Sequence, residues 1–138
     1  IYDDYISEFT SIEPLKDDLI SFIDLLLTIS NTNLIITTGI HCPNVLNNII
    51  NLGLNSRVKV YKKLDFLDLE NLTSKCKLLI SCHGAVSHVA AAHQIKQIDI
   101  IEKTKLNFYS KWTAHFRNYS PIYRKKFSAL TEEITKLL

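Results

Sequence analysis

Hydrophobic positions along the chain follow two spacings, and each spacing predicts a kind of element. Apolar residues that recur every three or four positions indicate helices, expected at residues 13–30, 44–52, from 65 or 68 to 72, and 84–93. Short apolar runs and one polar–apolar alternation indicate strands, expected at residues 34–37, 57–61, 78–82 and 97–101. Strands that alternate with helices predict an α/β, Rossmann-like, three-layer domain with a mostly parallel sheet of about four strands.

Two of these helices carry terminal signals. Thr10-Ser-Ile-Glu13 has the T-x-x-E form of a capping box, with Pro14 tolerated in the first turn of the helix that follows. Gly53 comes directly after the helix at 44–52, where glycine is the favoured C-terminal cap. These signals support the positions of the first two helices.

The C-terminal part of the chain predicts two further helices. Its first apolar stripe is aromatic and is expected in the core; its members are Phe108, Trp112, Phe116 and Tyr119. Ser120-Pro121 is typical of a helix start, so a last helix is expected over residues 122–137. Its apolar stripe is Tyr123, Phe127, Leu130, Ile134 and Leu137. Basic residues flank this stripe, so helix 122–137 is expected to contact a missing N-terminal domain or a homodimer partner.

Composition narrows the class of protein. The chain has 138 residues, of which 46% are hydrophobic and 22% charged, with a net charge of +2, as expected of one folded domain. No apolar run approaches the ~18 residues of a membrane span, and no secretory leader is recognisable. Cys42, Cys76 and Cys82 are odd in number and lack C-x-x-C spacing, which favours a reducing, cytoplasmic location. A first residue of Ile1 and the absence of methionine suggest a fragment, the C-terminal half of a longer protein.

The small net charge hides an asymmetry between the two ends of the chain. Residues 1–32 hold seven acidic residues against one lysine, a net −6, whereas residues 103–138 hold eight basic residues against two glutamates, a net +6. Solvated helix faces that attract one another account for this pattern. No nucleic-acid-binding motif accompanies the basic end, so no nucleic-acid partner is expected.

The most informative stretch is residues 77–93, a buried strand followed by a helix rich in small residues. A helix that begins at Gly84 directs unpaired N–H groups and the positive end of its dipole toward the carboxyl end of the strand, which suits a phosphate. His83, in the turn, and His88, one turn into the helix, are candidate hydrogen-bond donors. Further candidates at this edge of the sheet are Thr38 and Gly39 after the first strand and Glu102 after the fourth.

The sequence gives less support to a metal site or to a serine–histidine catalytic pair. His83, His88 and His93 are spaced at i, i+5 and i+10, which places successive side chains ~140° apart around a helix, so they cannot converge on a metal. Ser87 beside His88 is not a catalytic pair, because neighbours on a helix point in different directions.

The run from Cys76 through Cys82-His83-Gly84-Ala85 resembles the nucleotide-sugar-binding half of GT-B-fold glycosyltransferases. It is similar to the His-Gly-Ala family of xylosyltransferases and EGF-domain O-GlcNAc transferases, in which an aliphatic strand ending in Glu and then Phe-Tyr follow. In this chain the strand that ends in Glu is Ile98–Glu102, and the Phe-Tyr pair is Phe108-Tyr109. The similarity spans residues 57–119. The family's Gly-Leu-Thr after the alanine is Val86-Ser87-His88, and its Pro-Pro-Gly is absent. Heptosyltransferases, with a Gly-x-x-His turn, are looser relatives.

This resemblance implies a nucleotide-diphosphate sugar as substrate, with no other cofactor and no metal. The expected diphosphate contacts are His83, Gly84, Ala85, Ser87, His88, Thr38 and Gly39, and the expected ribose contact is Glu102. The resemblance places the acceptor site and the catalytic base in an N-terminal half.

Two other functions stay open at this point. Ile80-Ser-Cys-His-Gly84 also resembles the nucleophile elbow of DJ-1/PfpI-like cysteine hydrolases, which would make Cys82 a nucleophile and His83 its partner. Against this, no glycine precedes the cysteine and the sequence shows no carboxylate neighbour to fix a tautomer of His83. A non-catalytic α/β binding module is the third possibility.

Overall fold

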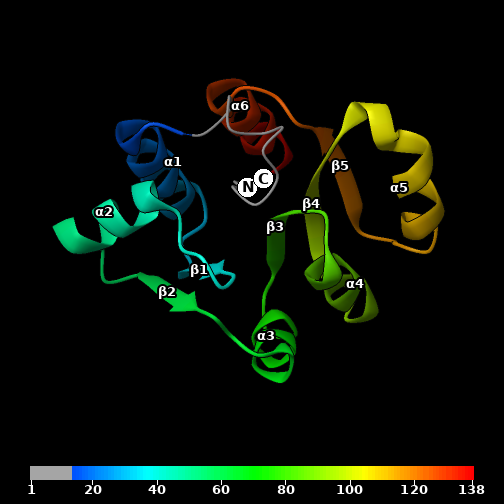
Figure 1. The fold of residues 1–138 in the computed structure, drawn as a ribbon, viewed down its shortest axis with the longest axis horizontal. Helices are drawn as coiled ribbons and strands as arrows, with labels where there is room; N and C mark the ends of the chain where they lie inside the picture. The colour runs from blue at the N-terminus through cyan, green and yellow to red at the C-terminus, as the bar shows by residue number, and fades with distance from the viewer. Residues whose placement is uncertain (1–13) are drawn as a thin grey trace. The chain divides into compact units, whose positions relative to one another are not determined.

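A computed structural model describes residues 14–138 (Figure 1). The described chain divides into two compact units, residues 14–65 and Phe66–Leu137. Both are α/β, with parallel sheets of two and three strands, so the Rossmann-like class predicted from the sequence is confirmed. Across residues 14–138, no helix combines the length and apolar character that crossing a bilayer requires.

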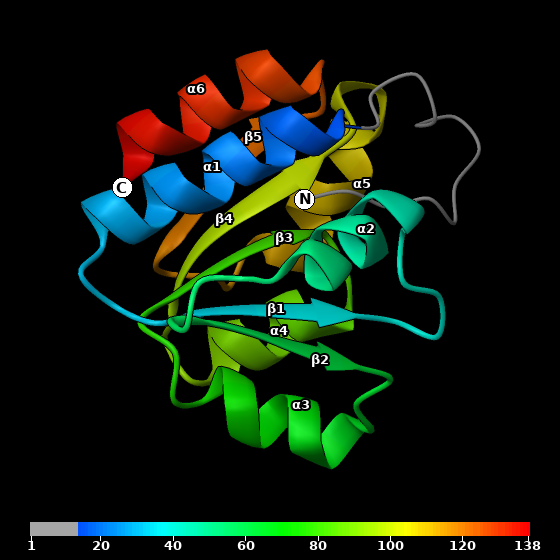
Figure 2. The ribbon, with the colours of Figure 1, turned by 90° about the vertical axis from the view of Figure 1, so that its left-hand side faces the viewer.

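The unit at residues 14–65 is built on two parallel strands. Its elements are α1 (Lys16–Ile29), β1 (Leu34–Thr38), α2 (Asn44–Leu52) and β2 (Val58–Lys62). β1 and β2 point in the same direction, with Leu34 opposite Val58 (Figure 2). Ile23 and Leu27 of α1 pack with Val58 in its core. Gly53 ends α2 at φ 93°, a left-handed conformation that favours glycine, as its position as a cap predicted.

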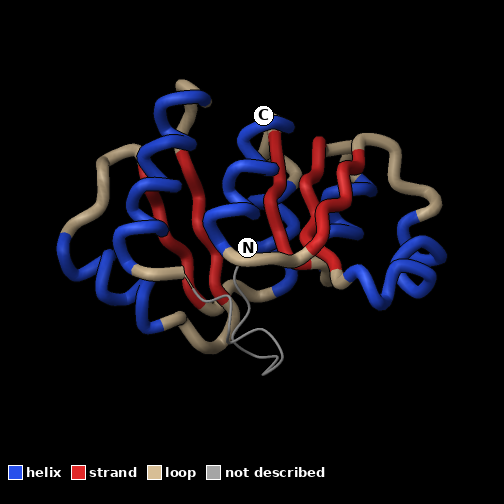
Figure 3. Tube along the Cα trace, turned by 90° about the horizontal axis from the view of Figure 1, so that it is seen from above, coloured by secondary structure: helices blue, strands red, loops and turns tan. Residues whose placement is uncertain are grey.

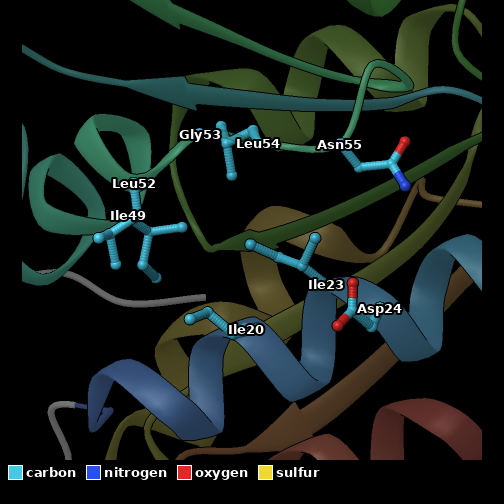
Figure 4. Close-up of a pocket in the computed structure, with 8 residues that line it drawn as sticks. All are labelled: Ile20, Ile23, Asp24, Ile49, Leu52, Gly53, Leu54 and Asn55. Atoms are coloured by element: carbon cyan, nitrogen blue, oxygen red, sulfur yellow. The ribbon is translucent and has the colours of Figure 1, made fainter.

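A small hollow lies between α1, α2 and the turn after α2 in this unit (Figure 4). Its volume of about 90 Å³ is well below the ~300 Å³ at which small-molecule pockets begin. Its lining is mainly aliphatic and consists of Ile20, Ile23, Asp24, Ile49, Leu52, Gly53, Leu54 and Asn55. The hollow is therefore a gap in the packing and not a candidate site.

The second unit holds the three-stranded sheet. Its elements are α3 (Phe66–Thr73), β3 (Leu78–Cys82), α4 (Ala85–Ala92), β4 (Lys96–Ile101), the 3₁₀ turn η2 (Lys103–Lys105), α5 (Leu106–Thr113), β5 (Tyr119–Tyr123) and α6 (Phe127–Leu137). The strand order is β3-β4-β5, and all three strands are parallel. β4 is therefore the central strand, and its last five residues are buried. Figure 3 shows the strands of both sheets in red, with helices beside them in blue.

Successive residues of β4 face opposite sides of the sheet and meet different surroundings. Ile98 and Ile100 are almost fully buried on one face, and α6 lies on that side (Figure 1). Asp99 faces the other side, where α4 contacts β3 and β4. The three-stranded sheet thus has an aliphatic face toward α6 and a polar strip toward α4.

The predicted start of the last helix is wrong. Residues 119–123 form β5 and not the start of a helix, and α6 begins only at Phe127. Ser-Pro is common at helix starts, but proline is also tolerated in a strand at the edge of a sheet, where its missing N–H breaks no ladder. Among residues 14–138, β5 pairs only with β4, so Pro121 is accommodated at this edge.

The aromatic stripe expected in the core is also different. Phe108 and Trp112 lie on α5 with 56% and 54% of their surface exposed, and α5 ends before Phe116 and Tyr119. Conversely, the stripe of α6 is covered within the chain: Phe127, Leu130 and Ile134 are 6%, 1% and 0% exposed. These three side chains are therefore buried within this chain, and a contact of helix 122–137 with a further domain or a second copy stays a prediction. The predicted capping box at Thr10–Glu13 lies outside the described residues.

Candidate functional site

A buried carboxylate organises the polar strip between the sheet and α4. Asp99 is 0% exposed and accepts four hydrogen bonds. Ser81 and Ser87 donate to Oδ1 at 3.1 and 2.9 Å, and Tyr119 donates to Oδ2 at 3.4 Å. The fourth partner is Nδ1 of His83, 2.6 Å from Oδ2. A buried carboxylate is stable only when it is satisfied in this way, and this one uses both of its oxygens.

His83 follows β3 in the strand-to-helix turn, and Asp99 fixes its ring. The His83 side chain is 11% exposed, so the ring is largely enclosed but not sealed from ligands. Because an ionised carboxylate only accepts, the Nδ1 atom carries the hydrogen in this contact. Nε2 is then the nitrogen that can meet a ligand. Asp99 therefore fixes the orientation of the His83 ring and leaves Nε2 toward the open side.

The start of α4 lies directly beyond His83. Gly84 caps the helix in an extended conformation, and its N–H donates to Ser87 Oγ at 3.4 Å. Ala85 and Val86 form the first turn, where backbone N–H groups lack an acceptor within the helix. Ser87 Oγ is 0% exposed and donates to Asp99, so it supports the network and is not the exposed phosphate donor that the sequence suggested.

His88 lies next to His83, inside a group of rings. Its ring centroid is 5.5 Å from that of His83, 5.1 Å from Phe116 and 6.1 Å from His115. Burial lowers the pKa of His88, and the neighbouring His83 and His115 lower this pKa further, against a smaller opposing effect of Asp99. His88 is therefore neutral at pH 7 and retains one ring N–H for donation.

Two tyrosines close the site on the side of α5 and β5. The Tyr109 ring is 4.9 Å from His83, and burial, followed by the nearby Glu102, raises the pKa of Tyr109. The pKa of Tyr119 is also raised, first by burial and then by Asp99. Both phenols consequently stay protonated at neutral pH and can donate hydrogen bonds.

Cys82 has a different neighbour from the one that a hydrolase would need. Its side chain faces the opposite side of the sheet from His83, and its sulfur lies 2.9 Å from Nη2 of Arg124. The ring of His83 meanwhile bonds to Asp99. The structure therefore does not bring Cys82 and His83 together as a nucleophile and its base.

The remaining candidates are divided between the two units. Glu102 follows β4, is largely buried, and forms an ion pair with Lys105 at 3.0 Å. Thr38 ends β1 and Gly39 follows it, in the unit of residues 14–65. The site of the Phe66–Leu137 unit thus contains His83, Gly84, Ala85, Ser87 and His88 from the predicted set, with Glu102 at the end of the adjacent strand.

Sequence reasoning missed Asp99, the residue on which the site depends. The expectation that His83 has no carboxylate partner is wrong, because the parallel pairing of β3 with β4 places Ser81 opposite Asp99. One signal was present: Asp99 is a single acidic residue inside the apolar strand Ile98–Ile101. Residues this far apart in sequence meet only through the strand register, which the pattern alone did not supply.

Between residues 14 and 138, no three or more histidine, cysteine, aspartate or glutamate side chains are grouped as a metal site. No known protein-family model matches the chain, and no curated protein matches it either.

Proposed function

We propose that the Phe66–Leu137 unit binds the diphosphate of a nucleotide sugar at the start of α4, as the donor-binding half of a glycosyltransferase. The observation that carries this proposal is the His83–Asp99 contact of 2.6 Å in the turn that leads into α4. It holds one imidazole beside a helix N-terminus, where backbone N–H groups and the dipole favour an anion.

Each residue has a separate part in this proposal. A phosphate oxygen accepts only from an N–H, so the proposal requires the doubly protonated form of His83, which donates to Asp99 through Nδ1 and to a phosphate oxygen through Nε2. The backbone of Ala85 and Val86 and the single N–H of neutral His88 contact the remaining oxygens. Glu102, at the end of the adjacent strand, accepts hydrogen bonds from the ribose hydroxyls. These donors stabilise the negative charge that develops on the departing diphosphate, and no covalent intermediate is needed.

The other parts of the proposal rest on the sequence. The resemblance of Cys82–Ala85 to the His-Gly-Ala family supports a sugar donor over other diphosphates, and it assigns the acceptor site to a further domain. The three cysteines Cys42, Cys76 and Cys82 are all unpaired, which supports a cytoplasmic location.

Calorimetry tests the proposal. The folded chain is titrated with UDP, GDP, CDP, ADP, inorganic pyrophosphate and the matching nucleosides. We expect at least one nucleoside diphosphate and pyrophosphate to bind, and the nucleosides to bind far more weakly. His83→Ala should weaken binding by about 1–2 kcal/mol, the loss of one charge-assisted hydrogen bond.

His93→Ala is the matched control, because His93 caps the opposite end of α4 and faces Glu70 at 3.8 Å. This variant should bind as the unmodified chain does. Absence of binding by all four nucleoside diphosphates and by pyrophosphate, with the protein folded, would refute the proposal.

A further inference from the structure

Two large aromatic side chains are exposed beside the candidate site. Phe108 and Trp112 lie one helical turn apart on α5, with ring centroids 6.1 Å apart and ring planes tilted by 52°. Both are more than half exposed. Adjacent exposed rings form an apolar patch of the kind found at binding surfaces.

Ring contacts connect this surface to the two histidines. The Phe108 ring is 5.6 Å from Tyr109, whose ring is 4.9 Å from His83. The Trp112 ring is 6.4 Å from His88. The exposed rings are therefore separated from the candidate diphosphate contacts by one side chain or none.

The charge of the surrounding segment fits an anionic ligand. Residues 103–118, which contain η2 and α5, have four lysines and arginines and no aspartate or glutamate. Lys111 is exposed and directly precedes Trp112. Aromatic rings interleaved with basic residues are the combination that binds nucleotides, with stacking for the base and positive charge for the phosphates.

We propose that Phe108 and Trp112 form a stacking platform for the base of the nucleotide, an inference that rests on the proposed diphosphate site. The base is joined to the diphosphate through one ribose and therefore lies within reach of the neighbouring surface. The faces of the Phe108 and Trp112 rings neither donate nor accept hydrogen bonds, so stacking on them recognises a flat ring and not the edge of a particular base.

Paired titrations with ADP and pyrophosphate test this platform. Trp112→Ala should weaken ADP binding about tenfold, within the range measured for base–aromatic stacking, and leave pyrophosphate binding within about twofold. Phe108→Ala should act in the same direction. Leu67→Ala on α3 is the control, because Leu67 is a comparably exposed apolar residue, at 72%, away from the rings.

Trp112 is the only tryptophan of the chain, so its fluorescence reports on the platform directly. Excited where adenine does not absorb, it should be quenched by ADP and not by pyrophosphate. Equal weakening of both ligands by Trp112→Ala, or ADP binding that does not change, overturns the platform. If pyrophosphate binds through His83 but ADP binds no more tightly than pyrophosphate, the stacking platform is refuted and the proposed diphosphate site is not. If neither ligand binds, both the platform and the proposed function are refuted.

Discussion

At the scale of single residues, the site depends on one buried contact. Asp99 receives four hydrogen bonds, yet only the one from His83 leads outward to the surface where a ligand can bind. The carboxylate is fully buried and offers no surface to a ligand. In the proposed site, Asp99 is therefore a positioning residue whose effect on binding would pass through the His83 ring.

Asp99→Asn separates this role from simple packing. Asparagine keeps the shape but turns an amide N–H₂ group toward Nδ1 of His83, which must then accept, so the ring becomes a neutral donor at Nε2. We expect pyrophosphate affinity to fall by about 1–2 kcal/mol and unfolding free energy to fall by about 1–3 kcal/mol. Calorimetry and urea unfolding measure the two effects.

Ser81→Ala is the matched control for this prediction. It removes a hydroxyl that donates to the same carboxylate at 3.1 Å but leaves the contact to His83 in place. It should cost about 1 kcal/mol of stability and leave affinity nearly unchanged. Equal losses of affinity in the two variants would contradict a positioning role for Asp99.

At the scale of elements, the residue that caps α4, Gly84, has no side chain. The backbone of Gly84 is extended, which any residue adopts, and a Cβ added there would have Cys82 O as its nearest neighbour, at 3.9 Å. The fold therefore has room for a methyl group at this position. Packing within the described chain therefore does not require glycine here, whereas a ligand that approaches the helix start would.

Gly84→Ala tests that need. We expect the unfolding free energy to change by about 1 kcal/mol or less, because alanine is only a poorer helix cap. Affinity for pyrophosphate should fall at least about tenfold, since the methyl group occupies the path to the Ala85 N–H. Ala92→Ser, an equally small addition at the exposed other end of α4, should leave binding unchanged. Normal affinity in Gly84→Ala would show that no anion contacts this turn.

The elements also show where sequence patterns suffice. β3, α4 and β4 lie within one or two residues of their expected ranges, because an apolar run, a small-residue helix and a second apolar run leave few alternatives. β5 was missed because Ser120-Pro121 fits both a helix start and an edge strand. The exposure of Phe108 and Trp112 was missed because helical spacing marks a face but not what covers it.

At the scale of the whole molecule, stability should depend on pH through His88. Its pKa in the folded chain is lowered by burial and by His83 and His115, so below about pH 6.5 the unfolded chain binds a proton that the folded chain does not. The unfolding free energy should therefore fall as the pH drops through about 6.5.

Urea midpoints between pH 7.5 and 5 measure this fall. Other groups also titrate in this range, so the relevant quantity is the difference between the unmodified chain and His88→Gln, which cannot take up the proton. The variant should show the shallower dependence on pH. An identical or steeper dependence would contradict the burial of a neutral His88.

The position of Asp99 in β4 has a consequence for how the strands align. A shift of β4 by one residue would move the carboxylate to the aliphatic side of the sheet, where Ile98 and Ile100 now lie, without any of its donors. An unpaired charge in such a layer costs several kcal/mol. If only the isoleucines opposed such a shift, the free-energy cost of the shift would be smaller. During folding, the same carboxylate thus discriminates against misregistered sheets, so mispaired forms should accumulate in Asp99→Leu.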